Sequence, residues 1–140
     1  MAKQATFLIV EDDDVDRMAL ERAFDKLKIL NDRVYARNGV EALDVLRGRN
    51  GKERLPRPFI ILLDLNMPQM NGLEFLDEVR NDEDLANSVV FVLTTSDADE
   101  DIVAAYENNV AGYIVKSDAA TGFLRAIEML EHYWRVVELP

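Results

Sequence analysis

Residues 60–68 read Ile-Ile-Leu-Leu-Asp-Leu-Asn-Met-Pro, and this stretch decides which fold the chain can adopt. Four large apolar residues in succession are typical of a strand buried on both faces, as the strands of parallel sheets are. Asp64 follows directly, and a turn with Pro68 comes next. Because open α/β sheets bind their ligands at the carboxyl ends of the strands, we expect the Asp64 carboxylate to face a ligand site.

The same kind of apolar run recurs along the chain and alternates with segments of helical period. Strands are predicted at 6–10, 33–37, 59–63, 89–93 and 111–115. Helices are predicted from Asp14, Val40, Asn71, Ile102 and Phe123 onward, where apolar residues recur every three or four positions. This alternation indicates an α/β fold, doubly wound, with a five-stranded parallel sheet of flavodoxin-like order 2-1-3-4-5 and helices on both faces.

The composition fits one soluble domain. The 140 residues are 49% hydrophobic, which is enough for a core, and they include no cysteine, so a disulfide framework is excluded. No apolar run approaches a bilayer span and the N-terminus lacks a signal-type stretch, so we expect a cytoplasmic protein with no membrane contact. The 27 acidic and 16 basic residues give a net charge of -11, which argues against nucleic acid as a partner.

A second acidic pair follows a second predicted strand. Glu11 and Asp12 come directly after residues 6–10, and neighbouring parallel strands would bring them beside Asp64. Two carboxylates about 4 Å apart repel by roughly 4 kcal/mol at a surface-like dielectric, so three of them need protonation or a cation. Their hard oxygens suit Mg²⁺. Each acid alone could instead cap a helix, but capping does not explain all three together.

Two further predicted strands end in groups that complement these acids. Thr94 offers a hydroxyl and Lys116 offers an ammonium. Carboxylates with a divalent cation, a hydroxyl and a lysine at one sheet edge indicate a phosphoryl-transfer site in which Asp64 is the nucleophile. Taken alone, Lys116 would be interpreted as an ordinary surface lysine.

These residues occur in the order and spacing of a known family. From about residue 5 to residue 133, the chain resembles the CheY-like receiver domains of bacterial two-component response regulators. The matching segments are Glu11-Asp12, residues 64–72, Thr94-Thr95 and residues 112–116. Each motif alone is moderately specific, whereas their combination is highly specific.

The resemblance implies a signalling function centred on a phosphorylated aspartate. Asp64 would accept a phosphoryl group from a phosphohistidine of a sensor histidine kinase. Glu11, Asp12, Asp64 and the backbone carbonyl of Asn66 would organise Mg²⁺. Such a module catalyses only its own phosphorylation and dephosphorylation, so we do not expect an enzyme that turns over a separate substrate.

The resemblance also implies a conformational switch. Thr94 and Lys116 would contact the phosphoryl oxygens, and Thr94 would move toward phosphorylated Asp64. Tyr113 would then rotate inward and change the surface formed by the fourth helix, the fifth strand and the fifth helix. From the residues alone, Tyr113 is an ordinary half-buried aromatic residue of a strand.

The chain departs from the family pattern around two of these residues. Receiver domains usually have a cis proline after the lysine, but Ser117 follows Lys116 here. A non-proline cis bond costs about 2.5–4 kcal/mol, so a trans bond is expected. The first acid is Glu11 where aspartate is commoner. Asn66 and Ser96 occupy positions that tune autodephosphorylation in the family.

The C-terminal arm, a long loop and the residue after Lys116 suggest a subfamily. We divide the chain into a receiver domain at 1–133 and a β-prone C-terminal arm at 134–140. The loop at 47–58 carries five bases and one acid, which favours a mobile solvated loop over a docking site for an acidic partner. Together with the Lys116-Ser117 pair, these features resemble single-domain regulators paired with phytochrome-like histidine kinases. That resemblance implies a homodimer in which the arm takes part, although Trp134 could equally cover the core of its own domain.

Two other functions are weighed against a phospho-accepting module. An aspartate-nucleophile phosphatase needs a second aspartate two residues after the nucleophile as general acid, and Asn66 cannot fill that role. An interaction module independent of phosphorylation would not need Asp64, Thr94 and Lys116 together, and all three are present.

Overall fold

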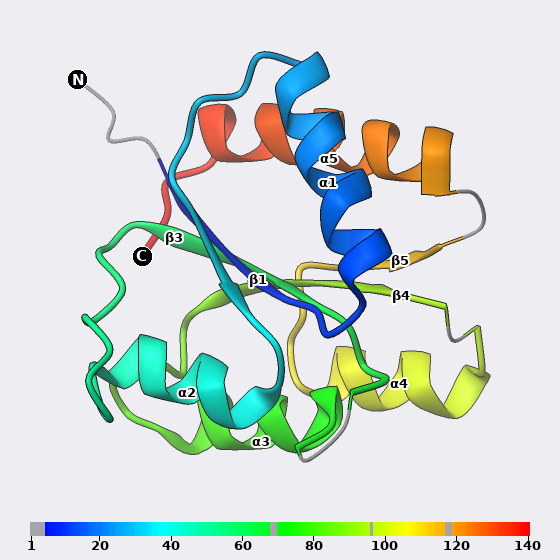
Figure 1. The fold of residues 1–140 in the computed structure, drawn as a ribbon. Coiled ribbons are helices and arrows are strands. Elements are labelled where there is room, and N and C mark those ends of the chain that lie inside the picture. The colour runs from blue at the N-terminus through cyan, green and yellow to red at the C-terminus, as the bar shows by residue number, and fades with distance from the viewer. Residues whose placement is uncertain (1–4, 68–69, 96, 117–118) are drawn as a thin grey trace.

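The computed structural model describes residues 5–67, 70–95, 97–116 and 119–140 of the chain. These residues form the predicted alternation of strands and helices (Figure 1). In chain order the elements are β1 (Thr6–Val10), α1 (Asp14–Lys26), β2 (Arg33–Ala36), α2 (Gly39–Arg47), β3 (Phe59–Leu63), α3 (Gly72–Asn81), β4 (Val89–Thr94), α4 (Asp99–Glu107), β5 (Gly112–Val115) and α5 (Ala119–Val136). The sheet is parallel with the order β2-β1-β3-β4-β5, so the predicted fold class is confirmed.

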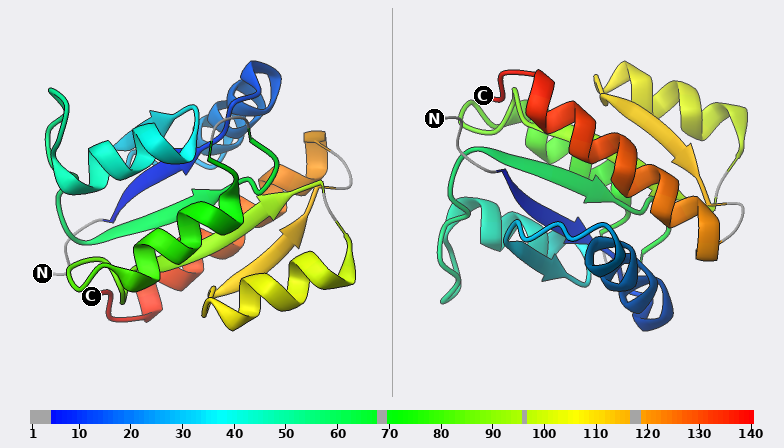
Figure 2. Two further views of the ribbon diagram at one scale, coloured as in Figure 1. Left: turned by 90° about the horizontal axis from the view of Figure 1, so that it is seen from below. Right: turned by 90° about the horizontal axis from the view of Figure 1, so that it is seen from above.

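The sheet is covered on both faces. Helices α1 and α5 lie on one face, and α2, α3 and α4 lie on the other (Figures 1 and 2). Every residue of β1 and β3 is buried. Because side chains alternate along a strand, Phe7 and Ile9 pack toward α1 and α5, whereas Leu8 and Val10 pack toward α2, α3 and α4. The continuous apolar runs of the sequence are thus explained by burial on two sides.

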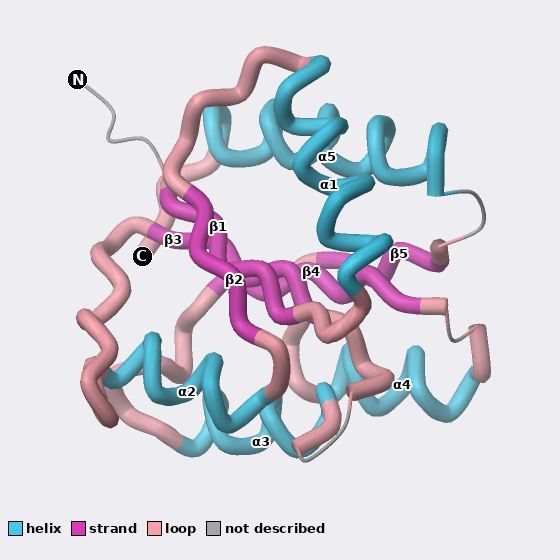
Figure 3. The backbone as a smooth tube through the Cα atoms, in the orientation of Figure 1, coloured by secondary structure: helices cyan, strands magenta, loops and turns pink. Residues whose placement is uncertain are grey.

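The register of the strands aligns their carboxyl ends at one edge of the sheet. Val10 of β1 pairs with Leu63 of β3, and Thr94 of β4 pairs with Val115 of β5. The Asp64 N–H donates to the Val10 carbonyl at 3.1 Å, so the chain continues beside β1 after β3 has ended. The tube view shows this strand edge facing the start of α1 (Figure 3).

Helix boundaries differ from the predicted ones where polar or small residues form the first turn. Helix α4 begins at Asp99 rather than Ile102, and α5 begins at Ala119 rather than Phe123. Helix α3 begins after Asn71, whose side chain and that of Glu74 form a reciprocal capping box. The spacing of apolar residues predicts the buried face of a helix, but it does not predict a first turn made of polar or small residues.

The predicted β-prone arm after Trp134 is wrong for its first residues. Helix α5 continues through Val136, and only residues 137–140 lie beyond it. The buried stripe extends from Leu130 to Trp134 at helical spacing, and its packing outweighs the β propensity of Val136. Trp134 and Leu139 are partly buried against the apolar cluster beneath α1 and α5. Trp134 therefore covers the core of its own domain.

The loop after α2 is anchored rather than simply solvated. Leu55 is 5% exposed, and its N–H donates to the Val45 carbonyl at 3.0 Å. The Asn50 amide donates to the Asp44 carboxylate at 2.9 Å, and the Arg57 guanidinium donates to a backbone carbonyl near α3. The prediction of a solvated loop therefore fails at Leu55, whose side chain joins the core.

Arg80 near the end of α3 binds the backbone of two turns, one shortly after it in the sequence and one far from it. Its guanidinium donates to the carbonyls of Asn108 at 2.6 Å, of Ala86 and Ser88 at 2.8 Å each, and of Asn109 at 3.1 Å. These bonds fix the turns that precede β4 and β5.

Among the described residues, no helix combines the length and the apolar character that crossing a bilayer requires.

We predict that Arg80→Met lowers the free energy of unfolding by about 2–4 kcal/mol, because several carbonyls lose a charged donor at once. Urea unfolding followed by circular dichroism measures this change. Arg22→Met on the exposed side of α1 is the matched control and should stay within about 0.5 kcal/mol of the wild type. Equal stability of the two variants would show that Arg80 does not hold these turns.

Candidate functional site

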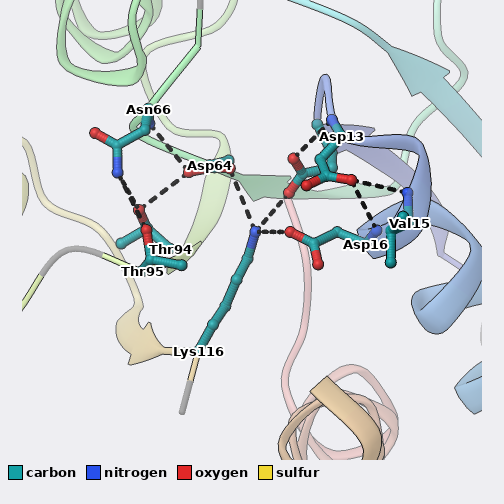
Figure 4. Close-up of polar contacts among 9 residues, drawn as sticks. Asp13, Val15, Asp16, Asp64, Asn66, Thr94, Thr95 and Lys116 are labelled. Atoms are coloured by element: carbon teal, nitrogen blue, oxygen red, sulfur yellow. Dashed lines mark hydrogen bonds and ion pairs between the residues drawn. The ribbon is translucent and has the colours of Figure 1, made fainter. Parts of the chain in front are cut away.

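Four strand ends bring the predicted site residues together. Asp64 follows β3, Glu11 follows β1, Thr94 ends β4 and Lys116 follows β5. Figure 4 shows the Asp64 carboxylate between Thr94 on one side and the Lys116 ammonium on the other. Glu11 is 2% exposed, Asp64 8% and Thr94 0%, so the charges at this edge have been largely removed from water.

Hydrogen bonds fix the orientation of the Asp64 carboxylate. Its Oδ1 accepts from the Thr94 hydroxyl at 3.0 Å and from the Asn66 N–H at 3.0 Å. Its Oδ2 lies 3.3 Å from Lys116 Nζ. Neutral donors on one oxygen and an ammonium on the other hold the Asp64 carboxylate in one rotational position, as a nucleophile requires.

Gly72 allows α3 to begin close to the Asp64 loop. A Cβ at this position would lie 2.6 Å from the Leu65 Cα and 2.9 Å from the Asp64 carbonyl oxygen. Both neighbours are backbone atoms, which cannot move aside as a flexible side chain can. The glycine of the 64–72 motif therefore has a packing role that the sequence pattern alone did not reveal.

Three acids at this edge could hold a divalent cation. Carboxylate oxygens of Glu11, Asp12 and Asp64 lie within 4.8 Å of one another. This set of hard oxygens, at the buried end of a partly open edge, fits Mg²⁺ or Mn²⁺ better than a softer metal. The Asn66 backbone carbonyl as a further ligand stays a prediction; the Asn66 side-chain amide lies 3.4 Å from the hydroxyls of both Thr94 and Thr95.

Lys116 contacts three carboxylates at once. Its Nζ lies 2.7 Å from Glu11 Oε2, 2.9 Å from Asp16 Oδ2 and 3.3 Å from Asp64 Oδ2. Its side chain is 6% exposed. Burial opposes the charge of the ammonium, but the hydrogen bonds and charges of these acids outweigh burial and raise the pKa of Lys116. Lys116 is therefore an interior counter-ion and not a surface lysine.

Glu11 is a site acid whose pKa is strongly raised. Burial raises the pKa of Glu11 to about 7, and the Asp64 charge acts in the same direction. The Lys116 hydrogen bond and charge oppose this rise, as does the Asp13 N–H, which donates to Glu11 Oε1 at 3.1 Å. Lys116 therefore offsets part of the effect that burial and the Asp64 charge have on Glu11.

The acids that follow Asp12 have separate roles. Asp13 is the N-cap of α1, where its Oδ1 accepts from the N–H groups of Val15 at 2.8 Å and Asp16 at 3.4 Å. Asp14 is exposed and pairs with surface arginines. Asp16 faces the site, although we did not predict it as a site residue. The signal was present in the crowding of acids after β1, but no spacing rule singles out Asp16.

The predicted switch residues occupy suitable positions. Thr94 is fully buried beside Asp64, and Tyr113 is a half-buried residue of β5 packed against the cluster on the α4 side. The proposed movement of these residues stays a prediction. Ser117 and Ser96 lie outside the described residues, so the trans bond expected after Lys116 and the tuning role of Ser96 also stay predictions.

Comparisons with known proteins agree with this arrangement. The model of the family "Response regulator receiver domain" matches residues 7–128. The probable methanogenesis regulatory protein FilR2 of Methanothrix harundinacea is 38% identical over 128 residues, which span 91% of this chain and 81% of FilR2. The response regulator Rcp1 of Synechocystis sp. is 34% identical over 134 residues, which span 95% of this chain and 91% of Rcp1.

Solved structures extend the likeness to nearly the whole chain. The Mn²⁺-bound form of Rcp1 has a TM-score of 0.86 at 33% identity, covering 98% of this chain and 99% of Rcp1. The phosphorylated cyanobacterial phytochrome response regulator RcpA has a TM-score of 0.89 at 32% identity, covering 99% of each chain. From the family match, these relatives and the fold, we conclude that the chain belongs to the response regulator receiver domain family.

Proposed function

We propose that Asp64 accepts a phosphoryl group from a phosphohistidine of a sensor histidine kinase, in a reaction that requires Mg²⁺. The observation that carries this proposal is the surrounding of one buried carboxylate by Thr94, Lys116 and two further acids. A buried aspartate with a purely structural role would not need an adjacent set of cation ligands.

The side chains have separate tasks in the transfer. An Asp64 oxygen forms a bond to phosphorus while the phosphorus–nitrogen bond of phosphohistidine breaks, and the imidazole leaves with the electron pair. The Lys116 ammonium neutralises charge on the phosphoryl oxygens. The Thr94 hydroxyl, which now donates to Asp64, can donate to a phosphoryl oxygen instead. That exchange of acceptor would draw Thr94 toward the new group and leave space for Tyr113.

Glu11, Asp12 and Asp64 would hold the divalent cation. When bound, the cation screens the repulsion between these acids and the incoming phosphoryl group. The related Rcp1 has an Mn²⁺-bound form, which supports divalent-cation binding by this chain as well, and we propose Mg²⁺ as its cation. The Asn66 carbonyl would complete the protein ligands.

The site does not favour a phosphatase with a separate substrate. The residue two positions after Asp64 is Asn66, whose amide lies 3.4 Å from the hydroxyls of Thr94 and Thr95. An amide cannot donate a proton to a leaving group as a carboxylic acid can. We therefore propose a switch that modifies only itself.

The partners follow from the same relatives. We propose a phytochrome-like histidine kinase as the phosphoryl donor, because RcpA is a cyanobacterial phytochrome response regulator. We also propose a homodimer that uses the end of α5, together with the chain that follows. Met129, Val136 and Val137 are 40%, 82% and 41% exposed there, although they are apolar.

We predict that acetyl phosphate with Mg²⁺ adds one phosphoryl group to the protein, and that Asp64→Asn lowers the labelling rate on the order of a hundredfold or more, because the nucleophile is lost. Intact-mass spectrometry measures the label. Asp77→Asn on the exposed face of α3 is the matched control and should be labelled like the wild type. Undiminished labelling of Asp64→Asn would rule out Asp64 as the acceptor.

Removal of divalent cations should stop labelling while the fold survives. The fold survives because Lys116 neutralises part of the acidic cluster without a metal. The experiment compares labelling and far-ultraviolet circular dichroism in excess chelator and after Mg²⁺ is restored. Labelling at an equal rate in excess chelator would contradict the metal requirement.

Val136→Glu should weaken self-association about tenfold or more, because it places a charge in the proposed apolar contact. Sedimentation equilibrium measures the dimer dissociation constant. Leu30→Glu is the control, since Leu30 is 87% exposed in the loop before β2. Point substitution is preferable to deleting the tail, because Trp134 and Leu139 also cover the core. Equal dissociation constants for both variants would exclude the end of α5 as the interface.

A further inference from the structure

Asp16 lies at the site, but the proposed phosphoryl transfer gives it no task. It lies in the first turn of α1, and its side chain points toward Lys116 (Figure 4). The distance from Asp16 Oδ2 to Lys116 Nζ is 2.9 Å, and the Asp16 side chain is 20% exposed. Asp14 on the same turn is 70% exposed and pairs with Arg17. The two acids of this turn thus have different environments.

The lysine and the cation would use some of the same carboxylates. Among the described residues, the acids grouped closely enough for a metal are Glu11, Asp12 and Asp64. The acids that contact Lys116 are Glu11, Asp16 and Asp64. Glu11 and Asp64 could therefore bind both the cation and the Lys116 ammonium, whereas Asp16 would bind only the ammonium.

We propose that Asp16 is a positioning residue that holds the Lys116 ammonium at the site after a divalent cation has engaged Glu11 and Asp64. This inference rests on the proposed phosphoryl transfer. The cation draws charge from the two shared carboxylates and so weakens their hold on Lys116. The lysine stem is flexible, so an ammonium without a strong partner would leave for water. Asp16 keeps it beside Asp64, where the phosphoryl oxygens arrive.

The sign of the effect separates positioning from simple repulsion. A carboxylate near the phosphoryl group also repels the donor, so removal of the Asp16 charge would accelerate phosphorylation if repulsion were its only effect. If Asp16 positions Lys116, removal of its charge slows phosphorylation. The structure favours positioning, because the ammonium lies closer to Asp16, at 2.9 Å, than to Asp64, at 3.3 Å.

The variants for the test are Asp16→Asn, which keeps the shape of the side chain, and Asp16→Glu, which keeps the charge. Asp14→Asn is the control for loss of an acid from the same turn, and Asp12→Asn is the control for loss of a metal ligand. The first measurement is the maximal rate of labelling by acetyl phosphate at saturating Mg²⁺. We expect Asp16→Asn to lower it about three- to tenfold, as for one lost charge-assisted hydrogen bond. Asp16→Glu should recover much of this rate, and Asp14→Asn should match the wild type.

Two further measurements do not depend on phosphorylation. The dissociation constant for Mn²⁺, measured by electron paramagnetic resonance of the free ion, should rise about tenfold or more in Asp12→Asn but stay within about threefold in Asp16→Asn. The nitrogen-15 resonance of the Lys116 ammonium should be protected from solvent exchange in Mg²⁺-saturated wild type and Asp14→Asn, and should lose protection in Asp16→Asn.

Specific results would overturn this inference. An unchanged or faster maximal rate in Asp16→Asn, with the ammonium still protected, would show that Asp16 does not position Lys116. A loss of Mn²⁺ affinity as large as that of Asp12→Asn would make Asp16 a metal ligand instead. If the wild type takes no label, the proposed phosphoryl transfer fails, and the resonance of Lys116 still decides the role of Asp16.

Discussion

The carboxylates at the carboxyl edge of the sheet are buried so closely together that they need a positive charge beside them. Glu11 is 2% exposed and Asp64 8%; burial raises the pKa of Glu11 to about 7, and the Asp64 charge adds to the rise. The Lys116 ammonium supplies that charge through contacts of 2.7 Å to Glu11 and 3.3 Å to Asp64. Glu11, Asp12 and Asp64 also lie close enough together to hold a divalent cation.

This constraint connects the fold to the proposed chemistry. The parallel register places the ends of β1, β3, β4 and β5 at one edge. The acids, the hydroxyl and the ammonium therefore meet directly at the strand ends. A divalent cation and a phosphoryl group would change the charge balance at this edge, and Thr94 and Lys116 would respond first. In the proposed function, the surface response of this chain would begin with this exchange of partners. Asp16 would keep Lys116 in place during the exchange.

The sequence predicted the fold and most of the site because the relevant signals are local. The run before Asp64 indicates a strand buried on two faces, and parallel strands carry their following residues to one edge. Asp16 was not predicted as a site residue for two reasons. The direction of its side chain depends on where α1 begins after its N-cap Asp13, and its partner Lys116 lies 100 residues away in the sequence. Arg80 was missed for a similar reason, since its four carbonyl acceptors lie in two turns, and one of these turns is far from Arg80 in the sequence.

The tail and the long loop show a different limit of the sequence. Local β propensity suggested an extended arm after Trp134, but the helical stripe of α5 continues and places Trp134 on the core. Five bases suggested a solvated loop, but the single apolar residue Leu55 anchors it. In both cases tertiary packing outweighed the local pattern, and packing cannot be read from a single segment.

In the proposed function, Asp64 carries the phosphoryl group. Borohydride reduces an aspartyl phosphate to homoserine, so treatment of the labelled protein followed by peptide mass spectrometry locates the modified residue directly. We expect homoserine at position 64 in the wild type and none at Asp12, Asp16 or any other aspartate. Homoserine at another position, with Asp64 unchanged, would contradict it.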